Sequence, residues 1–277
     1  MGIIIHDCDP TLFSLYRDPD DSLAIGFCVR RFVDDPLIVG ITTVHGNASI
    51  KTTYRIARRI VKVSGSKIPV YMGSSSSRSL GKTNKAVEFI ISSAKEYGEI
   101  EILATGPLTN IASALLLYPE LQDRVKRITI MGGSLFRRGN IYIFDAEFNF
   151  WANPVATKIV ISKLKNIVLT PLDITMKIKW GKDIVERLIQ KGDKLAKFLG
   201  YGVKPWSIVW SFVGGFNPHD TITAIYLYEP QIYCGKIISI DVFRFGKVVA
   251  SKKGKKIYVL LDVDGEKLKT TFLDAFI

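Results

Sequence analysis

The sequence predicts an α/β fold with a mostly parallel, open sheet and flanking helices, in a single domain that spans residues 1–277. Three observations support this prediction. Apolar runs of strand length alternate with longer amphipathic stretches, which is typical of βαβ units and a Rossmann-type core. No stretch of linker composition interrupts the chain, so we expect one domain. The end of the chain changes to a β-rich pattern, which predicts a C-terminal β-rich extension.

Six apolar runs predict the strands of the parallel sheet. In chain order they cover residues 2–6, 37–44, 68–72, 100–104, 127–131 and 167–170. The amphipathic stretches between them predict helices over residues 21–33, 50–64, 82–97, 108–117 and 154–163. Pro107 and Pro154 suit helix starts, and Asn153 suits the cap of the last of these helices.

The last third of the chain has a different pattern. We expect helices over residues 183–198 and 205–212, and a helical run over 221–228 directly after a polar segment at 217–220. From residue 237 onward, apolar runs separated by a Gly-containing turn predict a β meander.

The composition predicts a soluble protein with a sizeable core. Hydrophobic residues make up 47% of the 277 residues, enough for a core without disulfides. The three cysteines, Cys8, Cys28 and Cys234, are widely spaced and fit no zinc motif. Neither a signal peptide nor an apolar run of roughly 18 residues is visible. We therefore expect a cytoplasmic protein with no membrane partner.

The formal charge of +12 raises the question of nucleic-acid binding. Much of the positive charge lies in short runs at residues 58–59, 137–138, 177–182 and 252–256. No aromatic residues are interleaved with these runs to stack on bases. We interpret them as a solvated basic face and do not expect a nucleic-acid partner.

Small, polar and acidic residues follow five of the predicted strands. The carboxyl ends of parallel strands lie at one edge of a sheet, and ligands bind at that edge. The segments concerned are residues 6–10, 45–47, 105–110, 131–134 and 171–173. Together they predict a functional site.

Acidic residues are concentrated at the first of these strand ends. Five of the 26 lie within the first 21 positions: Asp7, Asp9, Asp18, Asp20 and Asp21. Like charges this close repel one another unless a cation lies between them. Oxygen ligands without a Cys or His cluster favour calcium or magnesium over zinc. The alternative interpretation is that Asp20 or Asp21 caps the following helix.

A second carboxylate beside a titratable group occurs at His219–Asp220, directly before an apolar helical run. A histidine in such a position is a candidate acid or base. The alternative is that this pair caps the helix and leaves His219 exposed. His45 lies in another of the strand-end segments.

The ordered motifs resemble those of the inosine-uridine-preferring nucleoside hydrolases. The matching pieces lie at residues 7–10 (DCDP), 20–24 (DDSLA), 40–47 (GITTVHGN), 68–73 (IPVYMG), 103–112 (LATGPLTNIA), 123–133 (DRVKRITIMGG), 139–140, 146–149 (AEFN), 153–154, 219–220 and 229–230. They follow the family's order from the first strand to about residue 230.

The resemblance implies a nucleoside hydrolase fold and a role for each matched position. A calcium ion would be held by Asp9, Asp21, Asp220 and the main-chain carbonyl of Thr105. Asp9 would also act as general base, and His219 would protonate a purine leaving group. The ribose would be bound by Asp20, Asn47, Glu147 and Asn149, with Met131 and Asn140 lining the sugar pocket.

These roles fit the chemistry of splitting a ribosyl C–N bond. The reaction passes through a cationic, oxocarbenium-like state, which a nearby anionic site stabilises. A cation activates and orients the attacking water, and a histidine can protonate the departing base.

The chain departs from the family pattern in two places. The family spacing Asp-x-Asp-Pro-Gly-x-Asp-Asp becomes a nine-residue interval, residues 11–19, and its Gly is missing. The family's loop over the nucleobase, after Gly73, is also absent. Trp206 and Trp210, four apart on a predicted helix, could stack on a base instead; the alternative is that both are core residues.

Two functions remain open at this point. The first is calcium-dependent hydrolysis of ribonucleosides to ribose and free base. The alternative is a nucleoside- or ribose-binding protein of the same fold that has lost turnover through its altered aspartate loop. The family habit suggests a homodimer or homotetramer.

Overall fold

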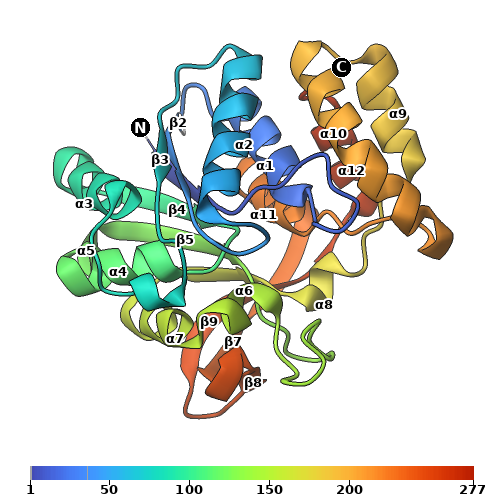
Figure 1. Ribbon diagram of the computed structural model, residues 1–277. Coiled ribbons are helices and arrows are strands. Elements are labelled where there is room, and N and C mark those ends of the chain that lie inside the picture. The colour runs from blue at the N-terminus through green and yellow to red at the C-terminus, as the bar shows by residue number, and fades with distance from the viewer. Residues whose placement is uncertain (1, 36) are drawn as a thin grey trace.

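The computed structural model describes residues 2–35 and 37–277 and is built on one nine-stranded sheet (Figure 1). The strand order is β3-β2-β1-β4-β5-β6-β9-β7-β8. The strands are β1 (Ile3–Cys8), β2 (Leu37–Thr43), β3 (Val70–Met72), β4 (Ile100–Ala104), β5 (Val125–Met131), β6 (Ile167–Thr170), β7 (Tyr233–Val242), β8 (Val248–Ala250) and β9 (Lys255–Val263). β1 to β6 are mutually parallel and have the order of a Rossmann-type core, which confirms the predicted fold class.

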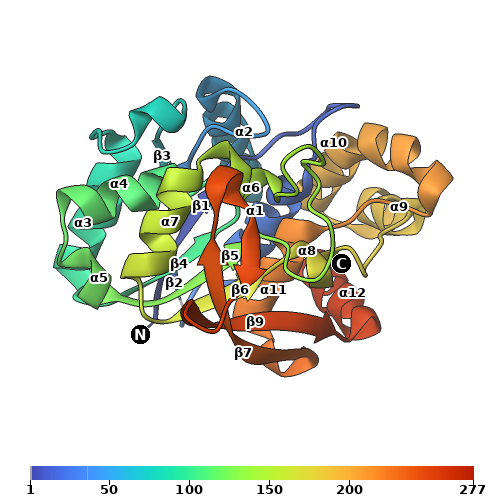
Figure 2. The same cartoon turned by 90° about the horizontal axis from the view of Figure 1, so that it is seen from below.

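Helices cover both faces of this sheet (Figures 1 and 2). One face carries α1 (Asp20–Arg31), α2 (Ile50–Ser64), α9 (Lys182–Lys191), α10 (Lys194–Trp210), α11 (His219–Tyr228) and α12 (Gly265–Leu273). The other carries α3 (Lys85–Tyr97), α4 (Thr109–Leu117), α5 (Leu121–Arg124) and α7 (Pro154–Lys163). The short helices α6 (Phe148–Ala152) and α8 (Leu172–Thr175) follow β5 and β6 in the chain.

The uninterrupted apolar sequence of β1 follows from this two-sided cover. Successive side chains of a strand point to opposite faces. Ile4 accordingly belongs to the core under α1 and α2, whereas Ile3 and Ile5 belong to the core under α3 and α4. Every residue of β1 is buried, including Asp7, so the strand places an acidic group at the centre of the molecule.

The predicted elements of the first two thirds are present, with small shifts at their ends. β4, β6, α2 and α7 match their predicted ranges. α7 begins at Pro154, and the Asn153 side chain accepts a hydrogen bond from the Ala156 N–H, which confirms the predicted cap. α3 begins later than predicted because Asn84 caps it, accepting from the main-chain N–H groups of the second and third helical residues.

The helices of the last third were predicted with wrong boundaries. The predicted helix over residues 183–198 is two helices, because Asp193 caps α10 and accepts from two main-chain N–H groups. Pro205 was predicted to begin a helix but lies inside α10. Buried residues on both sides of it, Val203 and Trp206, hold the helix through the break that proline would otherwise cause.

The predicted C-terminal meander is continuous with the main sheet. β9 pairs parallel with β6 and antiparallel with β7, and β8 forms the outer edge (Figure 1). The helix α12 that follows β9 was not predicted. Within the described part of the chain, none of the helices combines the length and the apolarity needed to cross a bilayer.

Candidate functional site

A cavity of about 400 Å³ opens at the carboxyl ends of the central strands. The strand order reverses between β1 and β4, and in open α/β sheets ligands bind at that reversal. The residues that line the cavity are Tyr16, Arg17, Asp18, Asp20, Gly46, Asn47, Thr105, Met131, Asn140, Ile141, Glu147, Phe148, Asn149, Trp206, His219 and Asp220. The predicted site residues are therefore together, with Asp9 and Asp21 fully buried behind the lining residues that they contact.

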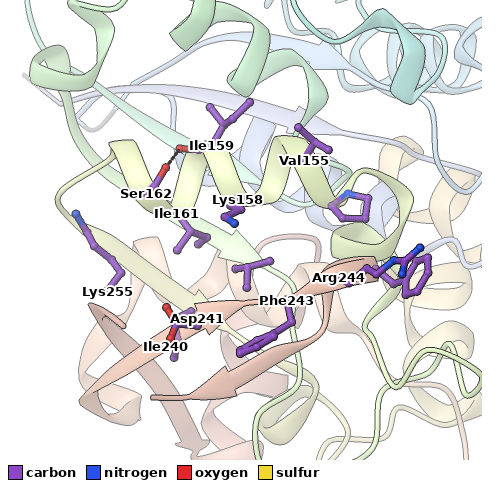
Figure 3. A pocket seen from close by; sticks show the side chains of 13 residues that line it. Val155, Lys158, Ile159, Ile161, Ser162, Ile240, Asp241, Phe243, Arg244 and Lys255 are labelled. Atoms are coloured by element: carbon purple, nitrogen blue, oxygen red, sulfur yellow. Dashed lines mark hydrogen bonds between the residues drawn. The ribbon is translucent and has the colours of Figure 1, made fainter. Parts of the chain in front are cut away.

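A larger cavity, about 810 Å³, lies elsewhere, between α7 and the β7–β8 hairpin (Figure 3). Its walls are mainly apolar, from Val155 and Ile159 on one side to Phe243 on the other. Among its described lining residues, Asp241 is the one carboxylate. With one carboxylate and no histidine among these residues, it offers fewer acid, base or cation-binding groups than the smaller, acidic cavity, which is therefore the candidate site.

Three of the carboxylates at the floor of this cavity are tied together through main-chain groups. The Asp9 N–H donates to Asp21 Oδ2 at 3.3 Å, and the Asp21 N–H donates to Asp20 Oδ1 at 3.0 Å. Thr105 Oγ1 donates to Asp21 Oδ1 at 2.6 Å, which connects the end of β4 to the cluster.

α1 begins at Asp20, its cap position is Pro19, and no side chain caps it. The interpretation of Asp20 or Asp21 as a helix cap is therefore wrong. Both carboxylates belong to the floor of the cavity, and they reach it despite the nine-residue interval that precedes them.

Burial and mutual repulsion disfavour the ionised form of these carboxyl groups when no cation is bound. Burial, and then the charge of Asp21, raises the pKa of Asp9 well above its usual range. Burial, and then the charge of Asp20, raises the pKa of Asp220 well above its range and that of Asp21 to about 7. Such a cluster needs either protons or a cation.

The donor set fits a hard cation. Asp9 Oδ1 is buried and has no hydrogen-bond partner among the described residues. Gly46 and Gly106 pack so closely on the Asp9 carboxylate that a Cβ on either would meet its oxygens. The groups that converge here are carboxylate and carbonyl oxygens, the ligands that calcium and magnesium prefer.

His6, Cys8 and Asp21 also lie close enough together to form a metal-binding group. Burial lowers the pKa of His6 to about 3, and His6 Nε2 is already bonded to Thr105 Oγ1 at 2.9 Å. Burial, and then the charge of Asp21, raises the pKa of the Cys8 thiol, which opposes the thiolate that a soft metal needs. The oxygen set is the better candidate.

Glu147 also lines the cavity. Its Oε1 accepts from the Asn149 N–H at 2.7 Å, and its Oε2 accepts from the N–H groups of Gly133 and Phe150 at 3.0 and 3.1 Å. Burial raises the pKa of Glu147 to about 7, against the opposing effect of these bonds. The carboxylate thus caps α6 and faces the cavity at the same time.

The remaining predicted sugar-binding residues surround the same space. Asn149 Nδ2 donates to the Thr105 carbonyl at 2.9 Å and to the Met131 carbonyl at 3.3 Å, which joins the ends of β4 and β5. The Asn47 N–H donates to Asp9 Oδ2. Asn140 is exposed at the rim, and Met131 is buried in the lining.

His219 is the first residue of α11, and its Nδ1 shares a hydrogen bond of 2.6 Å with Thr175 Oγ1. Burial lowers the pKa of His219, with the charge of Asp20 acting in the opposite direction. The side chain is partly buried and α11 has no side-chain cap, so the interpretation of His219–Asp220 as an exposed cap is wrong. His45 lies outside the described lining and bonds to Thr109 Oγ1 at 3.2 Å.

Trp206 and Trp210, for which the sequence left the same two interpretations open, have different positions in the structure. Trp206 belongs to the core under α1 and α10, as the alternative interpretation predicted, and it also lines the cavity. Its buried Nε1 has no partner among the described residues. Trp210 lies beside it, 5.4 Å between ring centroids, but outside the lining. Tyr16, Arg17 and Asp18 were missed as lining residues. The nine-residue interval that carries them was the signal, since extra residues beside a site have somewhere to reach.

Comparison with known proteins adds independent findings. The family model described as inosine-uridine preferring nucleoside hydrolase matches residues 4–270. The chain is similar to uridine nucleosidase 1 of Arabidopsis thaliana, with 30% identity over 265 residues, 84% of this chain and 76% of that protein. It is 29% identical to the inosine-uridine preferring nucleoside hydrolase of Leishmania major over 86% of this chain and 82% of that one. A solved plant nucleoside hydrolase has the same fold, with TM-score 0.86, 23% identity and coverage of 99% and 98%.

Proposed function

Since the chain belongs to the inosine-uridine preferring nucleoside hydrolase family, whose members hydrolyse the N-glycosidic bond of ribonucleosides, we propose that it is a calcium-dependent member of that family. The observation that supports the proposal is that Asp9, Asp20, Asp21 and Asp220 converge at one cavity. Glu147 and Asn149 line the same cavity, and Asn149 reaches the aspartates through Thr105. A cavity of about 400 Å³ lined by these carboxylates and amides suits a ribose ring and a base.

The residues that would hold calcium are Asp9, Asp21, Asp220 and the main-chain carbonyl of Thr105. When bound, a divalent cation lowers the pKa of a coordinated water and neutralises the repulsion between the carboxylates. The unpartnered Asp9 Oδ1 supports this assignment, because a buried carboxylate oxygen without a donor is costly.

Asp9 is the proposed general base. The attacking water forms a bond to C1′ of the ribose and gives its proton to Asp9, while the C1′–N bond breaks and the base leaves with the bonding electrons. The Asn47 N–H fixes one oxygen of Asp9, so the carboxylate has a set orientation toward the cavity.

The ribose hydroxyls would be bound by Asp20, Asn47, Glu147 and Asn149, with Met131 and Asn140 completing the pocket. Both oxygens of Glu147 are held by main-chain donors, so its position is fixed before substrate arrives. Negative charge held around the sugar favours the positive charge that develops on the ring in the transition state.

His219 would protonate the departing base when that base is a purine. Its bond to Thr175 fixes the ring and leaves Nε2 as the free nitrogen. Trp206 supports the placement of the base near His219, because both side chains line the same cavity and an aromatic side chain there provides apolar contact for a base.

Ribose release from a panel of ribonucleosides tests the proposal. The protein is pretreated with EDTA, and calcium is then restored. We expect ribose release that chelation suppresses and calcium restores, and no release from Asp9→Ala. A folded, calcium-loaded protein that binds nucleosides without cleaving any of them would instead be the ribose-binding relative considered above.

We also propose a cellular location, an oligomeric state and a single-domain organisation for the protein. Cys8 and Cys28 are buried free thiols and Cys234 is an exposed one, which suits a reducing, cytoplasmic environment. A homodimer or homotetramer and unfolding of residues 1–277 as one domain are our remaining expectations. Light scattering and one calorimetric transition would check them.

A further inference from the structure

The segment between Pro10 and Asp20 is longer than the family pattern allows, and its two ends are held together. Thr11 Oγ1 donates to the Asp18 carbonyl at 2.7 Å, and Ser22 Oγ donates to the Thr11 carbonyl at 2.6 Å. Asp18 Oδ1 accepts from the Asp20 N–H at 3.2 Å. The extra residues therefore leave the floor of the site in place and form an arch that stands out from it.

One side of this arch is fastened to α10. The Phe13 N–H donates to the Gly202 carbonyl at 2.9 Å, and the Phe13 ring packs edge-on against Phe198 at 5.5 Å. Leu12 lies so close to Gly202 that a Cβ on residue 202 would meet the Leu12 side chain. The segment runs beside α10 in Figures 1 and 2, in dark blue. Since α10 also carries Trp206, the arch and Trp206 are fixed relative to one another.

The far side of the arch faces the cavity. Tyr16 and Arg17 line the same cavity as Trp206. The Tyr16 side chain is 89% exposed, and its N–H donates to Ser14 Oγ at 3.1 Å, so a turn holds an aromatic ring in solvent. A ring kept exposed at the mouth of a binding cavity has its apolar surface available for a ligand.

The segment after β3 does not supply this cover. None of the residues from Gly73 to Thr83 is in the described lining of the cavity. Ser74 instead accepts and donates within the scaffold: its N–H donates to Asn110 Oδ1 at 2.8 Å, and its carbonyl accepts from the His45 N–H at 2.9 Å. The arch and Trp206 of α10 therefore contribute to the described lining of the cavity, and the segment after β3 does not.

We propose that Tyr16 is a substrate-binding residue that stacks on the nucleobase, and that the inserted arch replaces the missing base loop. The inference rests on the proposed function, since it assumes a ribonucleoside in this cavity. Every base has an aromatic face, so stacking by Tyr16 contributes affinity for purines and pyrimidines alike.

The test compares Tyr16→Ala, Tyr16→Phe and a matched control, Tyr201→Ala. Tyr201 is a 55% exposed tyrosine on α10 that lies outside the described lining. We expect Tyr16→Ala to raise KM for both inosine and uridine about tenfold, with kcat changed less. Tyr16→Phe should keep the wild-type KM, because the phenyl ring can still stack. The inhibition constant of free ribose should stay at its wild-type value in all three variants.

An unchanged KM in Tyr16→Ala would overturn the proposal. So would an equal weakening of ribose inhibition, because the ring would then act through the acidic floor and not on the base. Dissociation constants of inosine and uridine, measured calorimetrically in the Asp9→Asn background, repeat the comparison without turnover. If the wild-type protein binds nucleosides in a Tyr16-dependent way but does not cleave them, the proposed hydrolase activity is wrong and the role of Tyr16 stands. If the wild-type protein neither binds nor cleaves nucleosides, both proposals are wrong.

Discussion

The Asp220 N–H donates a hydrogen bond to Asp20 Oδ2 at 3.1 Å, joining two residues that are 200 positions apart. Thr221 Oγ1 adds a longer bond to the Asp20 carbonyl, at 3.4 Å. The N-termini of α1 and α11 therefore meet at the cavity, where the first turn of α1 brings Asp20 and Asp21 and that of α11 brings Asp220. The partial positive charge at a helix N-terminus favours carboxylates there, which offsets part of their mutual repulsion.

Asp220→Asn should weaken calcium binding while leaving the fold intact, because the Asp220 N–H that bonds Asp20 belongs to the main chain and is retained. Calcium at about 100 times its dissociation constant stabilises a folded protein by about 2.7 kcal/mol. We expect wild-type Tm to rise with calcium, and the rise to shrink strongly in the variant. Thermal melts across a calcium titration measure it. Equal shifts in both proteins would remove Asp220 from the ligand set.

Asp9→Asn should lower kcat by about 10² to 10⁴, the usual contribution of a general base. The amide keeps the size of the side chain, so Tm in the presence of EDTA should not fall. Steady-state ribose release provides the rate. Asp183→Asn, a surface carboxylate bonded to Lys269, is the control and should retain full activity. Retained turnover in Asp9→Asn would assign the proton transfer to another group.

Gly46→Ala should abolish activity through the position of Asp9, because the added Cβ would meet the Asp9 carboxylate. Gly265→Ala is the matched change far from the cavity, where the Cβ would lie 3.1 Å from the end of the Ile178 side chain. We expect at least a hundredfold loss of kcat/KM in the first and near-normal activity in the second. Comparable rates in the two variants would show that Asp9 tolerates displacement.

The calcium-free protein should lose stability as pH rises from about 4 to about 7. Burial raises the pKa of Asp7, Asp21 and Glu147 to about 7 in the folded chain, from ordinary values of 3.8, 3.8 and 4.5. Between these values the folded state holds protons that the unfolded state has released, so stability falls with increasing pH. Urea unfolding with EGTA at several pH values measures the slope. Saturating calcium should reduce the slope, because Asp21 is a proposed calcium ligand, and Glu147→Gln should also reduce it. A calcium-free slope of opposite sign would contradict the raised pKa values.

The parts of the fold that repeat local rules were predictable from sequence. The apolar runs of β4 and β6 and the amphipathic pattern of α2 gave their ranges correctly. The strand ends predicted where the candidate cavity lies, because parallel topology brings the ends of the strands together at one edge of the sheet. The prediction that a helix begins at Pro205 was wrong. Buried neighbours in α10 override the preference of proline for the first turn of a helix, and their burial depends on tertiary contacts.

The path of the arch at residues 11–19 could not be predicted from the sequence. Its length was visible in the sequence, but its path depends on Phe13 meeting Phe198 and Gly202, nearly 190 positions away. Thr175 was missed for a similar reason, since its bond to His219 exists only once α8 and α11 have packed. Contacts of this kind are set by tertiary packing and have no local signature.

The position of β9 has a consequence for how the chain is synthesised. β7 and β8 leave the ribosome before β9, yet in the finished sheet β9 lies between β6 and β7. Until residues 255–263 emerge, the β7–β8 hairpin has no strand through which to join the parallel sheet. A nascent chain stalled before β9 would thus carry all of the proposed catalytic residues on an unfinished sheet, with the edges of β6 and β7 open to any other extended polypeptide.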